Sequence, residues 1–192
     1  MSEEMYTRGD WIVHANYGVG QVKGKNTRIL DGKERIFLKV KTYSSEYFLP
    51  IKKWDVPHIR PLSSQYQIKK ALSILRQPPE PLSKDHKVRR KQILDAATDI
   101  SIYSKAEIIR DLNGRKKAGK LNLSETELFD KLVDRFINEW SIVSGKDREE
   151  ISEKLDKALT TSFEKLKKES DESWLEKVRK GVKIRRDQKN TS

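Results

Sequence analysis

The spacing of apolar residues changes once along this chain, near Ser64, and that change limits the possible folds more than any other feature. Between Glu34 and Tyr43 apolar and polar residues alternate, as they do in a strand with one buried face. After Ser64 apolar residues such as Ile68 and Leu75 recur at every third or fourth position, as on one face of a helix. The sequence therefore predicts an α+β protein with two domains.

The first part of the chain consists of short β-favouring runs separated by turn residues. The runs occupy residues 11–13, 20–24, 28–30, 34–43 and 47–49. Asp31 and Gly32 lie between two of them, and this dipeptide is a strong hairpin signal. We expect a small, strongly bent β-barrel of the Tudor or SH3 type, closed by Trp54, Val56 and Ile59.

The second part is predicted to be an all-α helical bundle. Prolines 78, 79 and 81 end its first helix, since proline cannot continue a helix, and we expect a hinge there. Two later helices are expected to begin with capping boxes, at Ser104 with Glu107 and at Ser124 with Glu127. The predicted domains are residues 1–62, a β domain; 63–82, a connecting helix and Pro-rich hinge; 83–170, a helical domain; and 171–192, a basic tail.

Composition excludes several classes of protein. The 192 residues are 35% hydrophobic and 36% charged, so no stretch approaches the roughly 20 apolar residues that a membrane span needs. Residues 1–4, MSEE, hold two acidic residues where a secretory signal would place basic ones, and a cytoplasmic location is expected. There is no cysteine, and the three histidines are scattered. We therefore expect no metal site, no cofactor and no catalytic site.

Positive charge is clustered, and the clusters predict a polyanionic partner. The net charge is +12; residues 84–120 hold 11 Lys and Arg against 5 Asp and Glu, and residues 177–192 hold 7 against 1. A solvated, lysine-rich helical surface is an equally weighted alternative for any single run. Side chains that neutralise phosphates give salt-sensitive binding that is nearly independent of sequence. The DNA-binding candidates are Lys84, His86, Lys87, Arg89, Arg90, Lys91, Arg115, Lys116, Lys117 and Lys120.

Two segments carry a resemblance to a known family. Residues 9–20, GDWIVHANYGVG, followed by a hairpin and by an apolar run ending in Pro50, resemble the polymerase-interacting domain of CarD/CdnL proteins and transcription-repair coupling factors. Residues 106–112, AEIIRDL, and 123–127, LSETE, are similar to the helical domain of CarD/CdnL proteins alone. A coupling factor would need a Walker A sequence, which this chain lacks. The resemblance covers about residues 8–143.

The resemblance implies a bacterial transcription regulator that acts as a monomer and is not an enzyme. Its β domain would bind the RNA polymerase β subunit by strand pairing, and its helices would bind promoter DNA near the upstream edge of the bubble to modulate open-complex stability. The matching polymerase-binding positions are Arg28, Tyr47, Phe48, Leu49 and Pro50.

Two of these positions depart from the family, and alternatives remain open. Arginine is frequent in the family at the position of Phe48, and the family's wedge tryptophan falls on His86. Tyr47 and Phe48 could instead simply pack the barrel, and His86 could be an ordinary first-turn residue. The alternative function is a Tudor-like nucleic-acid or ribosome-associated binding protein that does not act through RNA polymerase.

Overall fold

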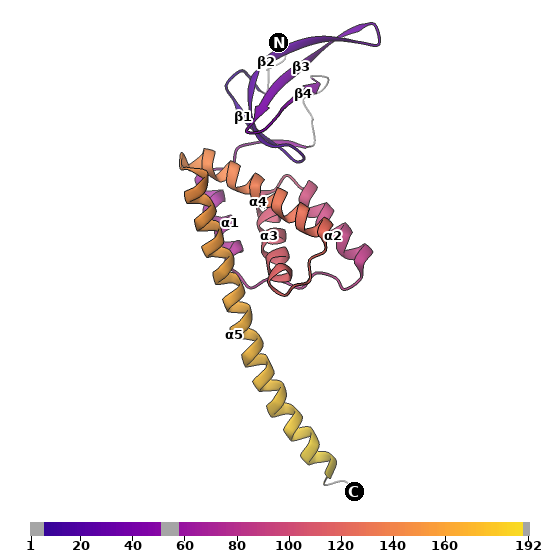
Figure 1. Ribbon diagram of the computed structural model, residues 1–192, viewed down its shortest axis with the longest axis vertical. Helices are drawn as coiled ribbons and strands as arrows, with labels where there is room; N and C mark the ends of the chain where they lie inside the picture. Colours follow the sequence, from indigo (N-terminus) through magenta and orange to yellow (C-terminus); the bar gives the residue numbers. More distant parts are fainter. Residues whose placement is uncertain (1–5, 51–57, 190–192) are drawn as a thin grey trace.

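The computed structural model describes residues 6–50 and 58–189, with side chains as far as Lys168. A five-stranded antiparallel sheet lies at one end, a body of helices lies below it, and the last helix runs away from that body (Figure 1). This arrangement confirms the expected α+β fold with two domains. The strand order is β4-β3-β2-β1-β5.

The strands follow the alternation in the sequence, with one merger. Their bounds are β1 Trp11–His14, β2 Gly18–Leu30, β3 Lys33–Thr42, β4 Glu46–Pro50 and β5 Ile59–Pro61. Two runs expected to be separate form the single strand β2, because a bulge between Val22 and Gly24 lets the chain bend without ending the pairing. Asp31 and Gly32 both have positive φ, 53° and 71°, as the predicted two-residue hairpin turn requires.

The sheet is open among the residues that the structure describes. β4 and β5 are its two edges and do not pair with each other there. Its core consists of Ile12, Val22, Leu38, Val40, Tyr47 and Leu49, with Ile59 packed against it. Ile59 thus covers the core as expected, whereas Trp54 and Val56 lie outside the described residues.

The helices are α1 Gln65–Leu75, α2 His86–Thr98, α3 Ile102–Lys117, α4 Leu123–Ser144 and α5 Arg148–Lys189. Both predicted capping boxes are wrong. The N-cap of α3 is Ser101, and that of α4 is Asn122, whose box partner is Glu125. Asn is as good an N-cap as Ser, and each earlier cap adds hydrogen-bonded residues to the helix.

The segment expected to be a hinge is fixed to the helical body. Ile68, Ala71 and Leu75 of α1 belong to the same core as α3, α4 and α5. After α1, the backbone N–H of Glu80 donates to Asp111 at 2.8 Å, and an added Cβ on Gly114 would lie only 2.6 Å from a side-chain carbon of Pro79. We therefore propose a domain boundary at residues 62–64, before α1, in place of one at residues 77–81.

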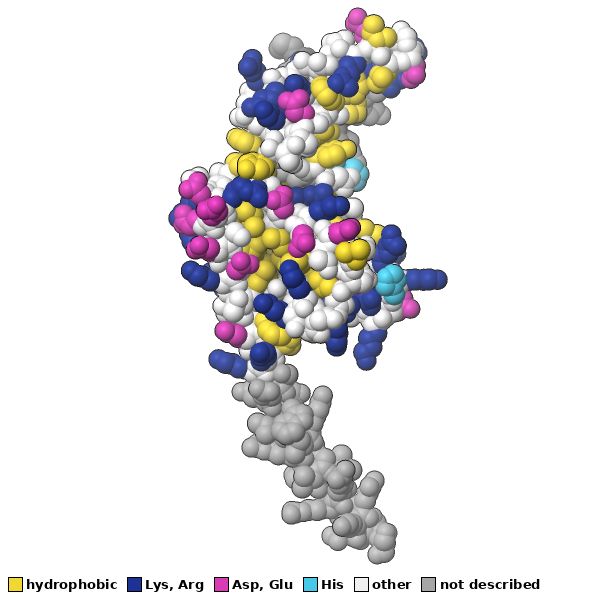
Figure 2. Space-filling view, in the orientation of Figure 1, with side chains coloured by type: hydrophobic (Ala, Val, Ile, Leu, Met, Phe, Trp, Pro, Cys, Tyr) yellow, Lys and Arg dark blue, Asp and Glu magenta, His cyan; other side chains and the backbone are white. Residues whose placement is uncertain are grey.

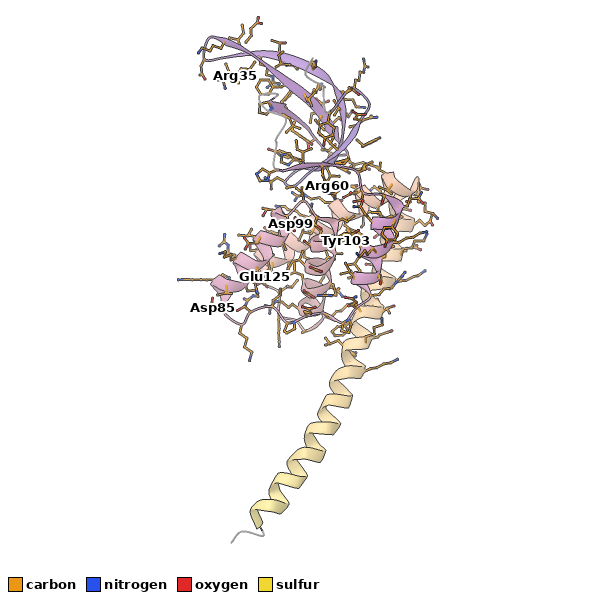
Figure 3. All side chains as sticks on the ribbon, turned by 180° about the vertical axis from the view of Figure 1, so that it is seen from behind. Arg35, Arg60, Asp85, Asp99, Tyr103 and Glu125 are labelled. Atoms are coloured by element: carbon orange, nitrogen blue, oxygen red, sulfur yellow. The ribbon has the colours of Figure 1, made fainter. Side chains whose placement is uncertain are left out.

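The two domains meet through a buried polar junction. Arg60 of β5 donates from both terminal nitrogens to the carboxylate of Glu139 in α4, at 2.6 and 2.8 Å, and from Nε to the carbonyl of Ile100 at 2.5 Å. Arg135 of α4 donates to the carbonyls of Ala15 and Asn16 in the β1–β2 turn. Figure 3 shows Arg60 where the sheet meets the helices. These bonds connect the sheet directly to α4, the helix that leads from the basic loop.

Candidate functional site

The free edge of β4 is the first candidate surface. Among the described residues β4 pairs only with β3, so its outer backbone groups are available to a partner strand. Tyr47 and Leu49 point into the core and are almost fully buried, and burial raises the pKa of Tyr47. The side chains of Tyr47 and Leu49 therefore pack the sheet, which for Tyr47 is the alternative interpretation given above. Only the backbone groups of these two residues are placed to contact a partner.

Phe48 and Arg28 come together on the opposite face of the same strands. The Arg28 guanidinium carbon lies 3.5 Å from the centroid of the Phe48 ring, a cation–π contact. Pro50 ends β4 and is exposed. Beyond Pro50 the hairpin continues without a β4 partner, and exposed apolar side chains lie there: Ile29, Leu30 and Ile36. Sequence reasoning missed these three, although they stand beside the hairpin turn that it predicted.

The second candidate surface surrounds the start of α2. Asp85 caps this helix by accepting from the N–H of Val88 at 2.9 Å. Five of the predicted DNA-binding side chains are exposed around the helix start: Lys84, His86, Lys87, Arg90 and Lys91. Figure 2 shows Lys and Arg side chains projecting from this end of the helical body, with a histidine among them.

Arg89 and Arg115 have a different position from the other predicted DNA-binding residues. Arg89 donates from Nε to Glu125 at 2.7 Å and from Nη1 to the carbonyls of Ser83 and Lys84. Arg115 donates to the carbonyl of Lys120 at 2.7 Å and approaches Glu125 at 3.4 Å. Both guanidinium groups therefore hold the protein together, and we remove them from the set of proposed phosphate contacts.

Glu125 is the centre of that network. Burial alone would raise its pKa, but the hydrogen bond from Arg89, the Asn122 backbone N–H and the charge of Arg115 outweigh burial and lower it. The carboxylate is therefore ionised at neutral pH and links the start of α2, the end of α3 and the start of α4. Figure 3 shows Asp85 and Glu125 on the same side of the helical body.

The remaining candidates follow α3 in the loop to α4. Lys116 lies 4.8 Å above the Phe129 ring and 4.0 Å from Asp130. Lys117 and Lys120 are exposed, and no ion pair involves either of them within the described part of the chain. Because Arg115 and Arg89 share Glu125, this loop and the start of α2 form one basic surface with two parts.

An apolar hollow lies within this basic surface. It has a volume of about 410 Å³ and is lined by His86, Arg90, Ile93, Leu94, Asn122, Leu123, Ser124, Glu125 and Leu128. Leu123, the first residue of α4, is 76% exposed. Sequence reasoning missed Leu123, because it placed the N-cap of this helix two residues later, at Ser124 instead of Asn122.

Comparisons with known proteins match two parts of the chain. Residues 6–63 match the family described as the CarD-like/TRCF RID domain, and residues 70–156 match the family described as the CarD C-terminal domain. The chain belongs to the CarD family. It is also similar to YdeB of Bacillus subtilis (strain 168), which is named as a candidate transcription factor, with 25% identity over 149 residues that cover 77% of this chain and 97% of YdeB.

The family assignment confirms the resemblance seen in the sequence. This CarD-family protein is a transcription factor with an RNA polymerase-interacting domain, and such factors are not enzymes. Within the described residues no group of His, Asp and Glu could hold a metal ion. None of the helices described is long and apolar enough to cross a membrane.

Proposed function

We propose that this CarD-family protein binds the RNA polymerase β subunit through the β4 edge and promoter DNA through the basic surface, near the upstream edge of the bubble, and so modulates open-complex stability. It would do so as a monomer in the bacterial cytoplasm. One observation carries the DNA part of this proposal. The segments that carry the exposed cations, the start of α2 and the loop after α3, are both tied to Glu125, through Arg89 and Arg115, and Glu125 lines a hollow together with His86, Arg90 and the exposed Leu123.

Binding to β rests on the free backbone of β4 together with the Arg28–Phe48 pair. An added strand gains main-chain hydrogen bonds from such an edge, and neighbouring side chains supply specificity. Phe48→Ala removes the ring beneath Arg28 without altering the core residues Tyr47 and Leu49, so it should weaken binding to purified β subunit. Lys33→Ala, at the far end of β3, is the control. Equal affinity of Phe48→Ala and the wild type would exclude this surface.

Phosphate contacts explain DNA binding that depends on salt more than on sequence. Lys87→Glu and Lys117→Glu, one from each part of the basic surface, should weaken binding to all promoter duplexes alike. Each lysine that no longer neutralises a phosphate should lower the salt slope by about 0.9. The matched double reversal Lys69→Glu with Lys165→Glu, on exposed positions of α1 and α5, should leave the slope unchanged. If both pairs act equally, net charge alone controls binding.

His86 and Leu123 are proposed to contact the bases at the bubble edge, where apolar side chains can insert between base steps. An imidazole offers less stacking area than an indole, so His86→Ala should shorten the open-complex lifetime by less than about tenfold. Leu123→Ala should also shorten it, and His86→Trp should lengthen it.

The lifetime is measured as decay of promoter complexes after a heparin challenge, with each variant saturating so that polymerase binding is not the variable. If His86→Trp and Leu123→Ala both leave the lifetime unchanged while Arg90→Ala shortens it severely, the protein holds the bubble edge by phosphate contacts alone.

A further inference from the structure

The face of the sheet opposite its core carries a row of aromatic and basic side chains that belongs neither to the β4 edge nor to the basic surface. Trp11 of β1 lies opposite Gln21 of β2, and Gln21 lies opposite Lys41 of β3. These three side chains form a cross-strand row, with Lys23 two residues further along β2. Trp11 is 37% exposed. An exposed tryptophan beside lysines on a sheet is the arrangement on which nucleic-acid bases stack.

This row forms one wall of a cleft between the two domains. The cleft has a volume of about 690 Å³, and its other wall consists of Asn138, Ser141 and Ile142 of α4 and residues 146–149 at the start of α5. Tyr43 stands at the cleft, 78% exposed, with the Arg148 guanidinium 4.8 Å from its ring centroid. Figure 2 shows hydrophobic side chains at the surface between the sheet and the helices, with Lys and Arg beside them.

The volume suits a small organic ligand, since such sites measure about 300–1,000 Å³. Val19 and Ile142 add apolar surface to the lining. The lining thus combines the planar ring of Trp11, the apolar side chains of Val19 and Ile142, and polar groups around them.

Charge indicates what kind of ligand fits. The lining contains four cations, Lys23, Lys41, Lys146 and Arg148, and two carboxylates, Asp147 and Glu149, so 4 − 2 leaves +2. Arg148 is bound by Asp134 at 2.7 Å and Lys146 by Glu150 at 2.5 Å. Lys23 donates to the neutral amide of Gln21 at 2.6 Å, and Lys41 forms no ion pair within the described residues. The two lysines on the sheet side, next to Trp11, are therefore not neutralised by a carboxylate.

We propose that this cleft binds a nucleotide unit, with its base stacked on Trp11 and its phosphates held by Lys23 and Lys41. A planar ring next to an anion is the feature that nucleotides share and that this wall complements. The same unit occurs in free nucleotides and in single-stranded nucleic acid. The site is separate from the basic surface at α2, and its occupation does not depend on the promoter contacts proposed there.

The test uses the full chain and three probes: ATP, inorganic triphosphate and the oligonucleotide (dT)6. The readout is the indole N–H signal of Trp11 in proton–nitrogen correlation spectra, assigned with Trp11→Phe. We expect ATP or (dT)6 to shift this signal saturably. The tighter of the two identifies the source, a free nucleotide or a single strand.

Variants separate stacking from charge. Trp11→Ala should weaken binding of the tighter probe, followed by calorimetry, by about fivefold or more, as loss of base stacking implies. Lys23→Glu with Lys41→Glu should weaken binding of every probe, whereas Lys69→Glu should not. The lysine variants are surface changes, so they remain informative if Trp11→Ala unfolds the sheet. The proposal is overturned if neither nucleotide probe shifts the signal, or if triphosphate binds as tightly as ATP and (dT)6 and a folded Trp11→Ala variant keeps the wild-type affinities.

Discussion

Replacing Glu139 by alanine should destabilise the protein far more than replacing an exposed glutamate. The Glu139 side chain is 4% exposed and accepts from both terminal nitrogens of Arg60 and from the backbone N–H of Ser63. Burial alone would raise the pKa of Glu139, but the hydrogen bond and charge of Arg60 outweigh burial and lower it. The carboxylate is therefore ionised, and it is the counter-charge for Arg60 and for the buried Lys105.

The size of the effect follows from what remains after the change. Glu139→Ala leaves the Arg60 guanidinium and the Lys105 ammonium in the junction without a carboxylate, and removing one partner of a buried ion pair costs about 3–5 kcal/mol. Urea denaturation followed by circular dichroism should report a decrease of that order in the free energy of unfolding. The exposed Glu164→Ala should change it by less than about 0.5 kcal/mol.

A second variant checks the assignment. In Glu139→Ala combined with Arg60→Met, part of the stability should be recovered, because one of the unpaired cations is removed. A decrease below about 1 kcal/mol for Glu139→Ala alone is typical of surface pairs and would refute the reasoning. Faster hydrogen exchange at the Ser63 amide with an unchanged global transition would also refute it, since the junction would then open without cost to either domain.

Three further outcomes are expected. Burial, with Arg60 as the next cause, lowers the pKa of Lys105 to about 8. Between about pH 8 and 10.4 the unfolded chain, with a lysine pKa of about 10.4, therefore still binds a proton that the folded chain has released. The free energy of unfolding should rise by on the order of 3 kcal/mol over this pH range. Urea titrations of Lys105→Met should not show this rise. Gly114→Ala should lower the free energy of unfolding, measured by thermal denaturation, by about 1–3 kcal/mol because its Cβ would meet the rigid ring of Pro79; an unchanged transition would mean that the proline segment can move. Glu125→Ala should weaken binding to duplex DNA, measured by fluorescence anisotropy, although it raises the net positive charge. The control Glu127→Ala should not weaken binding. Tighter binding by Glu125→Ala would show that the carboxylate repels DNA by its charge and does not position the basic surface.

Local patterns predicted the parts of the fold that depend on neighbouring residues. The alternation from Glu34 to Tyr43 predicted β3, and Asp31 with Gly32 predicted the turn that begins it. On β4, Tyr47 is buried and the neighbouring Phe48 lies on the opposite face, as the alternation of side chains along a strand requires. Strand register and hairpin chemistry are set within a few residues, so a single sequence contains them.

Features that depend on distant residues could not be predicted in this way. Arg89 resembles Arg90 in sequence, yet Arg89 is bound by Glu125, 36 positions away, and Arg90 is exposed. The periodicity of α1 predicted a helix but not that its apolar face packs on α3, so the prolines after it were interpreted as a hinge. The cap of α4 was misplaced because Asn122 and Ser124 are both good caps, and only the packed helix distinguishes them.

The short connection between β5 and α1 has a consequence for spacing along DNA. Only three residues separate Pro61 from Gln65, and three extended residues reach at most about 11 Å. With Arg60 bound to Glu139 on one side of this connection, the β4 edge and the α2 surface are held at a fixed separation. If the β4 edge binds the polymerase and the α2 surface binds DNA as proposed, this fixed separation determines where the protein contacts the duplex. Its position on DNA is then set by the polymerase and not by the base sequence.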